Sequence, residues 1–121
     1  MQLTTNFSLE EFRCKDGTKI PFELMDNVQE LAANLQILRD EIKEPIHVNS
    51  GYRTPSYNKK VGGKPASKHM KAQAADITAK NFSPTGLALI IERLIKERRM
   101  KQGGLGIYLG FVHYDVRGTK A

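Results

Sequence analysis

The chain has 121 residues, enough for one hydrophobic core and too few for two ordinary ones, so we expect a single domain over residues 1–121. Hydrophobic residues make up 40% of the sequence and charged residues 26%, which is typical of globular proteins and argues against disorder. A net charge of +6 favours an anionic partner, such as nucleic acid, an anionic membrane or a bacterial wall, without choosing among them.

The only cysteine, Cys14, excludes an internal disulfide, so the fold must depend on its core, with or without a metal. The first residues lack the basic start and unbroken apolar run of a signal peptide. No segment approaches the roughly 18 apolar residues of a membrane span. We therefore expect a protein that is made in the cytoplasm without a signal peptide and has no membrane span. We also expect it to be a monomer.

The first half of the chain predicts two helices and a strand. Ser8 to Glu11 has the spacing of a capping box and predicts a short helix that contains Phe12. From Pro21 to Pro45 apolar residues recur at helical spacing, which predicts the main core helix. Its buried positions are Phe22, Met25, Val28, Leu31, Ala32, Leu35, Leu38 and Ile42. Residues 46–49 alternate apolar and polar side chains and predict a short strand.

The second half begins with a long polar segment. Residues 51–68 predict a loop with a single helical turn after Pro55, and a loop of this length in a small domain is usually functional. Residues 74–78 predict a strand. Ser83 as N-cap and Pro84 at the first position predict a second long helix. Its buried side has Leu87, Ile90, Ile91, Leu94 and Ile95.

Glycines and basic residues mark the end of this second helix. We expect Gly103-Gly104 to terminate it, and the basic run 96–101 to lie in its last turn, where cations suit the helix dipole. Residues 105–108 and 111–117 predict two final strands joined through Leu109-Gly110. The fold class is therefore α+β, with two long helices packed on a small, mostly antiparallel sheet.

Two of the three histidines have unusual neighbours. His69, at the end of the loop, precedes by seven residues Asp76, which lies in an otherwise apolar strand. A charged Asp there is costly unless it is paired or bound to a metal. His113 shares one face of its strand with Phe111, Asp115 and Arg117.

Two imidazoles and one carboxylate form a three-ligand zinc set, and a catalytic zinc site keeps its fourth position open for water. In the alternative reading, His69 is a loop residue, Asp76 caps a helix or pairs with a lysine, and His113 is satisfied within the sheet. Spacing alone leaves both readings open. His47, on a separate short strand, is not an expected ligand.

Several spaced motifs stand out along the chain, and they are Ser50-Gly51-Tyr52-Arg53-Thr54, Asn58 through Gly62-Gly63, Ser67-x-His69-x6-Asp76-Ile77, and Gly104-Leu105-Gly106-x-Tyr108-x-x-Phe111-Val112-His113-x-Asp115-x-Arg117-Gly118. In this order they resemble the zinc D-Ala-D-Ala carboxypeptidase family, which includes L-alanyl-D-glutamate endopeptidases of phage endolysins and, more distantly, the hedgehog signalling domain. The resemblance implies a fold of the hedgehog and D-Ala-D-Ala-peptidase type that covers the chain from its first helix to its last strand.

The resemblance also implies residue roles. It implies one zinc ion held by His69, Asp76 and His113. It further implies that Arg53 binds substrate or stabilises negative charge on the attacked carbonyl. Ser67 is expected to shape the loop by a local hydrogen bond or to touch substrate.

The sequence departs from the family at three positions. Ala72 stands where the family often has Gly, a change that should not remove zinc. Several relatives have an acidic general base three residues before the last His, or a second His two before it, and here those positions are Gly110 and Phe111. Asp115 is our candidate for the missing base, with a contact to Arg117 or support of His113 as its alternative roles.

The implied function is that of a zinc-dependent peptidase hydrolysing peptidoglycan stem peptides or cross-links, as a D-Ala-D-Ala carboxypeptidase or an endopeptidase. The substrate lies in the bacterial wall, whereas the protein is expected to be made in the cytoplasm without a signal peptide. We therefore expect a phage product, released by lysis or mounted on a particle. The alternative is a zinc-stabilised wall-binding or phage structural module without hydrolysis, which Gly110 in place of an acid motivates. A nucleic-acid partner is not expected, because basic residues are scattered and no binding motif occurs.

Overall fold

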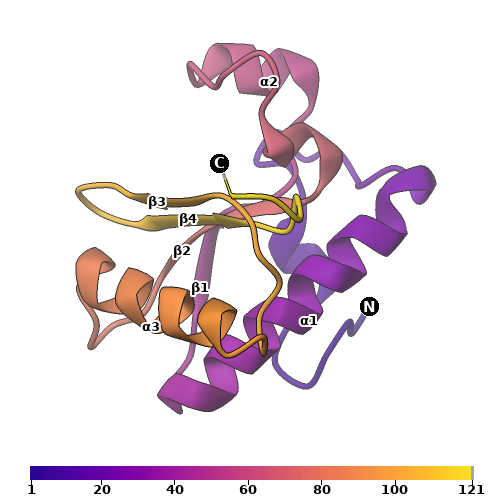
Figure 1. Ribbon diagram of the computed structural model, residues 1–121. Coiled ribbons are helices and arrows are strands. Elements are labelled where there is room, and N and C mark those ends of the chain that lie inside the picture. The colour runs from indigo at the N-terminus through magenta and orange to yellow at the C-terminus, as the bar shows by residue number, and fades with distance from the viewer. Residues whose placement is uncertain (121) are drawn as a thin grey trace.

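Residues 1–120 are described in the computed structural model, in which two long helices and a four-stranded sheet form an α+β fold (Figure 1). This confirms the predicted fold class. The long helices are α1 and α3, and α2 is a short helix within the polar segment. The elements in chain order are 3-10 turns η1 (Leu9–Phe12) and η2 (Phe22–Leu24), α1 (Met25–Ile42), β1 (His47–Ser50), α2 (Pro55–Lys60), 3-10 turn η3 (Lys68–Lys71), β2 (Ala74–Thr78), α3 (Pro84–Lys96), β3 (Leu105–Ile107) and β4 (Val112–Asp115).

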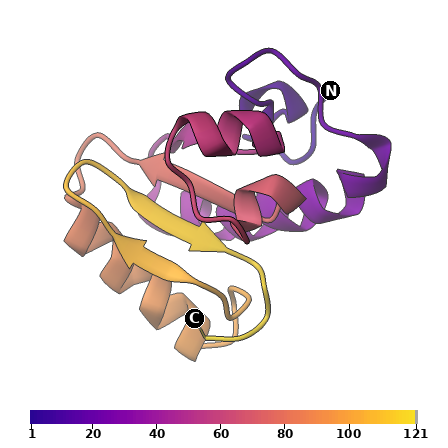
Figure 2. The ribbon, with the colours of Figure 1, turned by 90° about the horizontal axis from the view of Figure 1, so that it is seen from above.

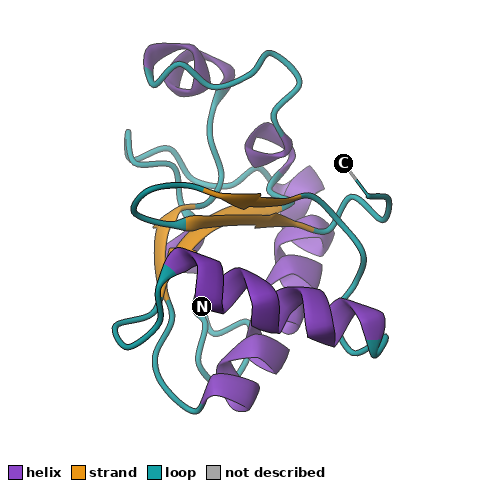
Figure 3. Ribbon diagram, turned by 60° about the vertical axis from the view of Figure 1, so that its left-hand side comes forward, coloured by secondary structure: helices purple, strands orange, loops and turns teal. Residues whose placement is uncertain are grey.

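The sheet has the order β1-β2-β4-β3, and each neighbouring pair is antiparallel. Helices α1 and α3 lie together on one face of the sheet, while α2 and η3 lie on the opposite side (Figures 1 and 3). Seen from above, α2 and η3 lie over the sheet (Figure 2). Alternate residues of the central strands therefore face either the long helices or the side where α2 and η3 lie.

The core lies between the sheet and the long helices. Side chains from α1, α3 and the central strands form one buried cluster, which includes Leu31, Leu35, Ile77, Ile91 and Tyr114. The predicted capping box forms, since the Ser8 N–H donates to Glu11 Oε2 at 2.7 Å and a 3-10 turn follows. Within residues 1–120, no helix is both long and apolar enough to cross a membrane.

Two predicted helix boundaries were wrong. The core helix begins at Met25 rather than near Pro21, and Phe22 is 87% exposed because the chain enters through the η2 turn, off the helix face. Helix α3 ends at Lys96 rather than at Gly103-Gly104, and two residues later Arg98 adopts a left-handed backbone with φ of 61°. A left-handed residue cannot continue a right-handed helix.

The basic run 96–101 at the end of α3 is largely neutralised by acids of α1 and by Glu97, the C-cap of α3. Arg99 pairs with Glu41 and Glu97, and Lys101 pairs with Glu30. Arg93, one turn earlier, also pairs with Glu41. These contacts join the end of α3 to α1, which supports a structural role for the run.

Candidate metal centre

The fold brings His69, Asp76 and His113 together. Their candidate ligand atoms lie within 4.8 Å of one another. Asp76 and His113 are direct cross-strand partners of β2 and β4, so both side chains leave the sheet on the same face. His69 comes from η3, and its Nε2 lies 3.2 Å from Asp76 Oδ1. His113 Nδ1 lies 3.1 Å from the same oxygen.

The ring of His69 is fixed by a backbone carbonyl. Its Nδ1 lies 2.7 Å from Gly51 O, and the Arg53 N–H donates to the His69 carbonyl at 3.0 Å. A carbonyl oxygen can only accept, so Nδ1 must carry the proton of this hydrogen bond. In the neutral ring, Nε2 therefore presents a lone pair towards Asp76.

The ring of His113 is fixed by a carboxylate. Its Nε2 donates to Asp115 Oδ2 at 2.8 Å, and Asp115 is fully buried. The neutral ring consequently keeps its proton on Nε2 and directs the Nδ1 lone pair at Asp76 Oδ1. Carboxylates that hold the outer nitrogen of a metal-binding histidine are a recurring feature of zinc sites.

Three candidate ligand atoms thus converge on one point, Asp76 Oδ1, His69 Nε2 and His113 Nδ1, and all three are acceptors when both rings are neutral. Facing lone pairs repel unless a proton or a metal ion lies between them. Burial disfavours the charged form of His113, but hydrogen bonds to Asp115 and Asp76 outweigh it and raise its pKa to about 9. Burial likewise opposes ionisation of Asp76, yet the hydrogen bonds of the two histidines hold its pKa well below the usual range.

The donor set fits zinc. Two imidazole nitrogens and a carboxylate oxygen are ordinary zinc ligands, and three protein ligands are the number that a catalytic site uses. Both rings are held by partners on their outer nitrogens, as metal-binding histidines are. The residues present could therefore hold the ion that the sequence implied.

Asp115 is surrounded by donors. Its Oδ1 accepts from the Gly104 N–H and from Arg117 Nε, both at 2.9 Å, and its Oδ2 accepts from Arg117 Nη2 at 2.8 Å as well as from His113. Burial opposes ionisation, but these hydrogen bonds outweigh it and hold the pKa of Asp115 far below normal. Its assignment as general base stays a prediction, and the contacts to Arg117 and His113 that we considered as alternatives are present.

Gly104 is required for this arrangement. A Cβ at position 104 would clash with Asp115 Oδ2 and would lie 2.9 Å from Arg117 Nη2. Only glycine lets the backbone come close enough for its N–H to reach the carboxylate. Gly103 and Gly104, which we expected to end α3, therefore pack against Asp115, the carboxylate that holds His113.

Arg53 contacts the second oxygen of Asp76. Its Nη2 lies 3.1 Å from Asp76 Oδ2, its Nε donates to Ser50 Oγ at 3.1 Å, and its Nη1 donates to Asn58 Oδ1 at 3.3 Å. Asn58 is buried, and sequence reasoning gave it no role beyond its place in a shared motif. Arg53 is thus placed next to the centre by polar partners on three sides.

Ser67 and Ala72 flank η3. Ser67 Oγ accepts the His69 N–H at 3.2 Å, which is the local hydrogen bond expected of it, while a substrate contact stays a prediction. Ala72 ends the turn with φ of 55°, a left-handed conformation that glycine adopts without steric cost. The resemblance implied Gly at this position, and this conformation is one that glycine adopts readily.

The centre opens into a cleft of about 570 Å³. Among the residues described, Asp76 is the only carboxylate that lines it. Phe111 stacks on Tyr108 with ring centroids 4.7 Å apart, and Gly110 precedes it in the turn between β3 and β4. His47 lines a different cavity, at the far end of β1 and β2. The cleft lining comprises Arg53, Val61, Gly62, Lys64, Ala66, Ser67, Lys68, His69, Asp76, Gly104, Leu105, Gly106, Tyr108, Phe111, His113 and Arg117.

A comparison with known families agrees with this geometry. The family model described as Peptidase M15 matches residues 5–115, which is nearly the whole chain. No curated protein matches the sequence. The matched range contains the three candidate ligands, Arg53 and Asp115. The chain therefore belongs to the Peptidase M15 family.

Proposed function

We propose that this peptidase is zinc-dependent and hydrolyses peptidoglycan stem peptides or cross-links, with His69, Asp76 and His113 as its metal ligands. The observation that carries the proposal is the convergence of three candidate ligand atoms, from His69, Asp76 and His113, in the lining of a cleft. Membership of a peptidase family supplies the reaction class, and the resemblance of the motifs to wall-cleaving relatives supplies the substrate class.

Zinc bound to these ligands would supply Lewis acidity, lowering the pKa of water and polarising the carbonyl of the scissile bond. The residues around the centre prepare the ligands. Gly51 O and Asp115 fix the tautomers of His69 and His113, so both lone pairs point inward. Because the rings are already oriented, binding the metal requires little rearrangement.

Arg53 is the proposed helper of the transition state. Its guanidinium lines the cleft and is partly exposed, with a side-chain exposure of 14%. From there it can stabilise the negative charge that develops on the attacked carbonyl oxygen. Ser67, in the same lining, is the proposed polar contact to the substrate backbone.

For Asp115 we propose a positioning role. It does not line the cleft, its Oδ1 accepts from Gly104 and Arg117, and its Oδ2 accepts from His113 and Arg117. A general base must reach the proton that it removes, directly or through one water. The contacts of Asp115 therefore support an action on the metal ligand rather than on the substrate.

The proposed setting is the bacterial wall, reached from the cytoplasm through phage lysis or on a phage particle. The net charge of +6 suits a wall that carries anionic groups. A wall-binding module without hydrolysis is the second candidate, because Asp76 is the only carboxylate among the cleft residues described.

Digestion of defined muropeptides tests both candidates. Purified protein would be analysed for bound metal and incubated with muropeptides of known structure, with and without a chelator, and released peptides identified by mass spectrometry. We expect one zinc per chain, a product that identifies the scissile bond, and loss of that product with chelator or with His113→Ala. Bound zinc and muropeptide binding without any product would favour the module, and absence of zinc would refute the metal centre.

A further inference from the structure

We propose that Lys64 and Lys68 form a carboxylate-binding subsite on the rim of the cleft, so that the preferred peptide carries a free carboxylate in addition to the bond that is cleaved. This inference rests on the proposed function and adds a substrate feature to it. It starts from the charged residues of the cleft lining, of which some cations have an acidic partner and others have none within residues 1–120.

The cleft contains more positive charge than its acids can balance. Four cations line it, Arg53, Lys64, Lys68 and Arg117, against the single carboxylate of Asp76. Arg53 pairs with Asp76, and Arg117 pairs with Asp115 behind the lining. Among residues 1–120, neither lysine takes part in an ion pair. A bound divalent cation would increase this excess further.

The backbone that carries the two lysines is anchored to the centre, while the side chain of Lys64 is exposed. Lys68 is half-buried in η3, directly before the ligand His69, and its carbonyl accepts the Gln73 N–H at 3.1 Å. Lys64 lies in the loop after α2, where its carbonyl accepts from Asn58 Nδ2 at 2.9 Å. Since Asn58 also holds Arg53, the loop is joined through Arg53 to Asp76. Both ammonium groups are therefore carried by backbone that is anchored to the ligands.

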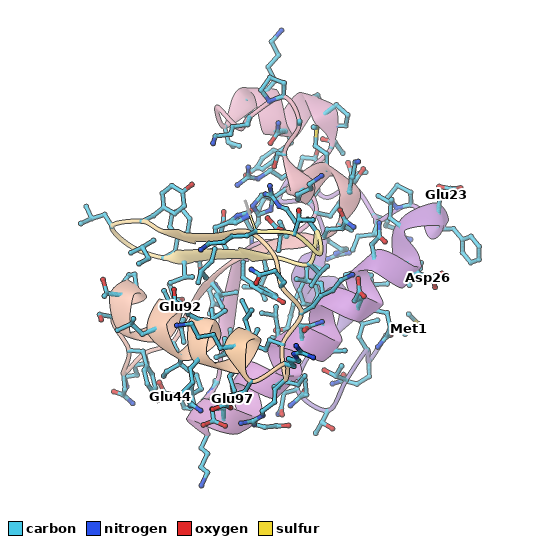
Figure 4. The ribbon with its side chains drawn as sticks, viewed as in Figure 1. Met1, Glu23, Asp26, Glu44, Glu92 and Glu97 are labelled. Carbon is cyan, nitrogen blue, oxygen red and sulfur yellow. The ribbon has the colours of Figure 1, made fainter. Side chains whose placement is uncertain are left out.

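Within residues 1–120, Asp76 is the only acid that lines the cleft, since Asp16, which accepts a hydrogen bond from Thr54 at the start of α2, is not part of the lining. The acids labelled in Figure 4 lie around the two ends of α1 and on α3, away from α2 and the loop that follows it. A carboxylate entering the cleft thus meets positive charge from the rim and little repulsion. Complementary charge of this kind favours binding and orientation of an anionic ligand. Wall peptides, which carry free carboxylates, are ligands of this chemistry.

Matched peptides and variants test the subsite. The zinc-loaded protein would be assayed on two pairs of stem peptides, one differing in a side-chain carboxylate against its amide and the other in a C-terminal carboxylate against its amide. Variants would be Lys64→Glu, Lys68→Glu and the charge-conserving Lys68→Arg. Lys71→Glu is the matched control, because Lys71 is exposed in the same η3 turn and does not line the cleft. Equilibrium binding of the peptides to metal-free protein provides a readout that is independent of turnover.

We expect amidation at one of the two positions to raise KM about two- to fivefold for the wild type, with kcat little changed, because a salt bridge at a partly exposed site is modest. Lys68→Glu and Lys64→Glu should raise KM similarly for the acid and remove the preference over the amide. Lys68→Arg and Lys71→Glu should keep the preference. The metal-free protein should show the same ranking in binding.

Several results would overturn the inference. Equal KM values for acid and amide at both positions would show that no carboxylate is recognised. A preference that survives both glutamate substitutions would assign the carboxylate to Arg53 or the metal. Tighter, steeply salt-dependent binding of DNA than of any peptide would assign the rim to a nucleic acid. If wild type cleaves no peptide of either pair, the proposed function fails instead, and the binding measurements still decide the subsite.

Discussion

The two histidines of the centre are held in position by different means. His69 lies on a 3-10 turn and donates to a backbone carbonyl, that of Gly51, which carries no net charge. His113 lies on a strand and donates to a buried carboxylate, that of Asp115. Both arrangements select the tautomer whose lone pair faces Asp76. They differ in how strongly they stabilise the protonated ring, because a carboxylate stabilises a charged imidazole more than a carbonyl does.

The difference extends to what each support requires. The His69 support is built from backbone, since Gly51 O and the Arg53 N–H contact the ring and the carbonyl of His69. The His113 support is built from a side chain, which needs Arg117 to balance its charge and Gly104 to leave it room. Side-chain substitutions can therefore dismantle the second support one contact at a time, whereas the first resists them.

The largest effect is expected from removing either ring. His69→Ala and His113→Ala should each abolish stoichiometric zinc binding, because two remaining protein ligands are too few for a stable site. Metal content by mass spectrometry and affinity by calorimetry would measure the loss. His47→Ala is the control, since His47 is exposed and lies outside the cluster. Zinc retained by either alanine variant would contradict the ligand set.

Asp115→Asn weakens the carboxylate contact that holds His113 and leaves the carbonyl contact that holds His69 unchanged. The variant keeps the shape of the side chain, removes its charge and leaves Arg117 without its acidic partner. We expect zinc affinity to fall about 10- to 100-fold, the usual cost of losing a partner of a metal-binding histidine. Competition with a chromophoric chelator would measure it. If affinity is unchanged but turnover disappears, Asp115 would instead be the general base.

The carboxylate support makes zinc binding depend on pH. His113 has a pKa of about 9 in the metal-free protein, so zinc must displace a proton below that pH, and affinity should rise about tenfold per pH unit up to about 9. In the metal-free fold, the same raised pKa stabilises the protein below pH 6.5, and this stabilisation is lost as pH rises through about 9. Calorimetry in buffers of different ionisation enthalpy would count the released protons, and zero release at pH 7 would contradict the prediction.

Gly104→Ala tests the room that Asp115 needs. The added methyl clashes with a carboxylate oxygen that is itself held on several sides, so the free energy of unfolding should fall by about 1–3 kcal/mol. Denaturant unfolding would measure it. Gly110→Ala is the matched control, because a Cβ there meets nothing within 4 Å. Equal stability of the two variants would show that the close approach of Gly104 is not required.

The smallest effect is expected at the His69 support. Ala72→Gly relieves a left-handed backbone but removes a buried methyl and adds chain entropy to the unfolded state. These contributions oppose one another, so we expect the free energy of unfolding to change by less than about 1 kcal/mol. Zinc affinity should be unchanged. A large loss of affinity by calorimetry would mean that the alanine methyl positions His69.

Local patterns in the sequence predicted most of the fold. Helical spacing placed the buried side of α1, and the Ser83-Pro84 pair placed the start of α3 at Pro84. The errors occur where backbone conformation is decided by residues distant in sequence. Phe22 matched the helical period but lies on a turn, and Gly103-Gly104 resembled a helix end but packs against Asp115.

By itself, the sequence determined the type and order of the main elements and the α+β class, because these depend on local spacing, and its motifs singled out three residues whose chemistry suits a metal. Only the tertiary structure decided which atoms face one another. Cross-strand pairing brought Asp76 beside His113, and a carbonyl and a carboxylate from separate segments fixed the two tautomers. Such contacts depend on strand register and backbone approach between distant segments, which no pattern within one segment records.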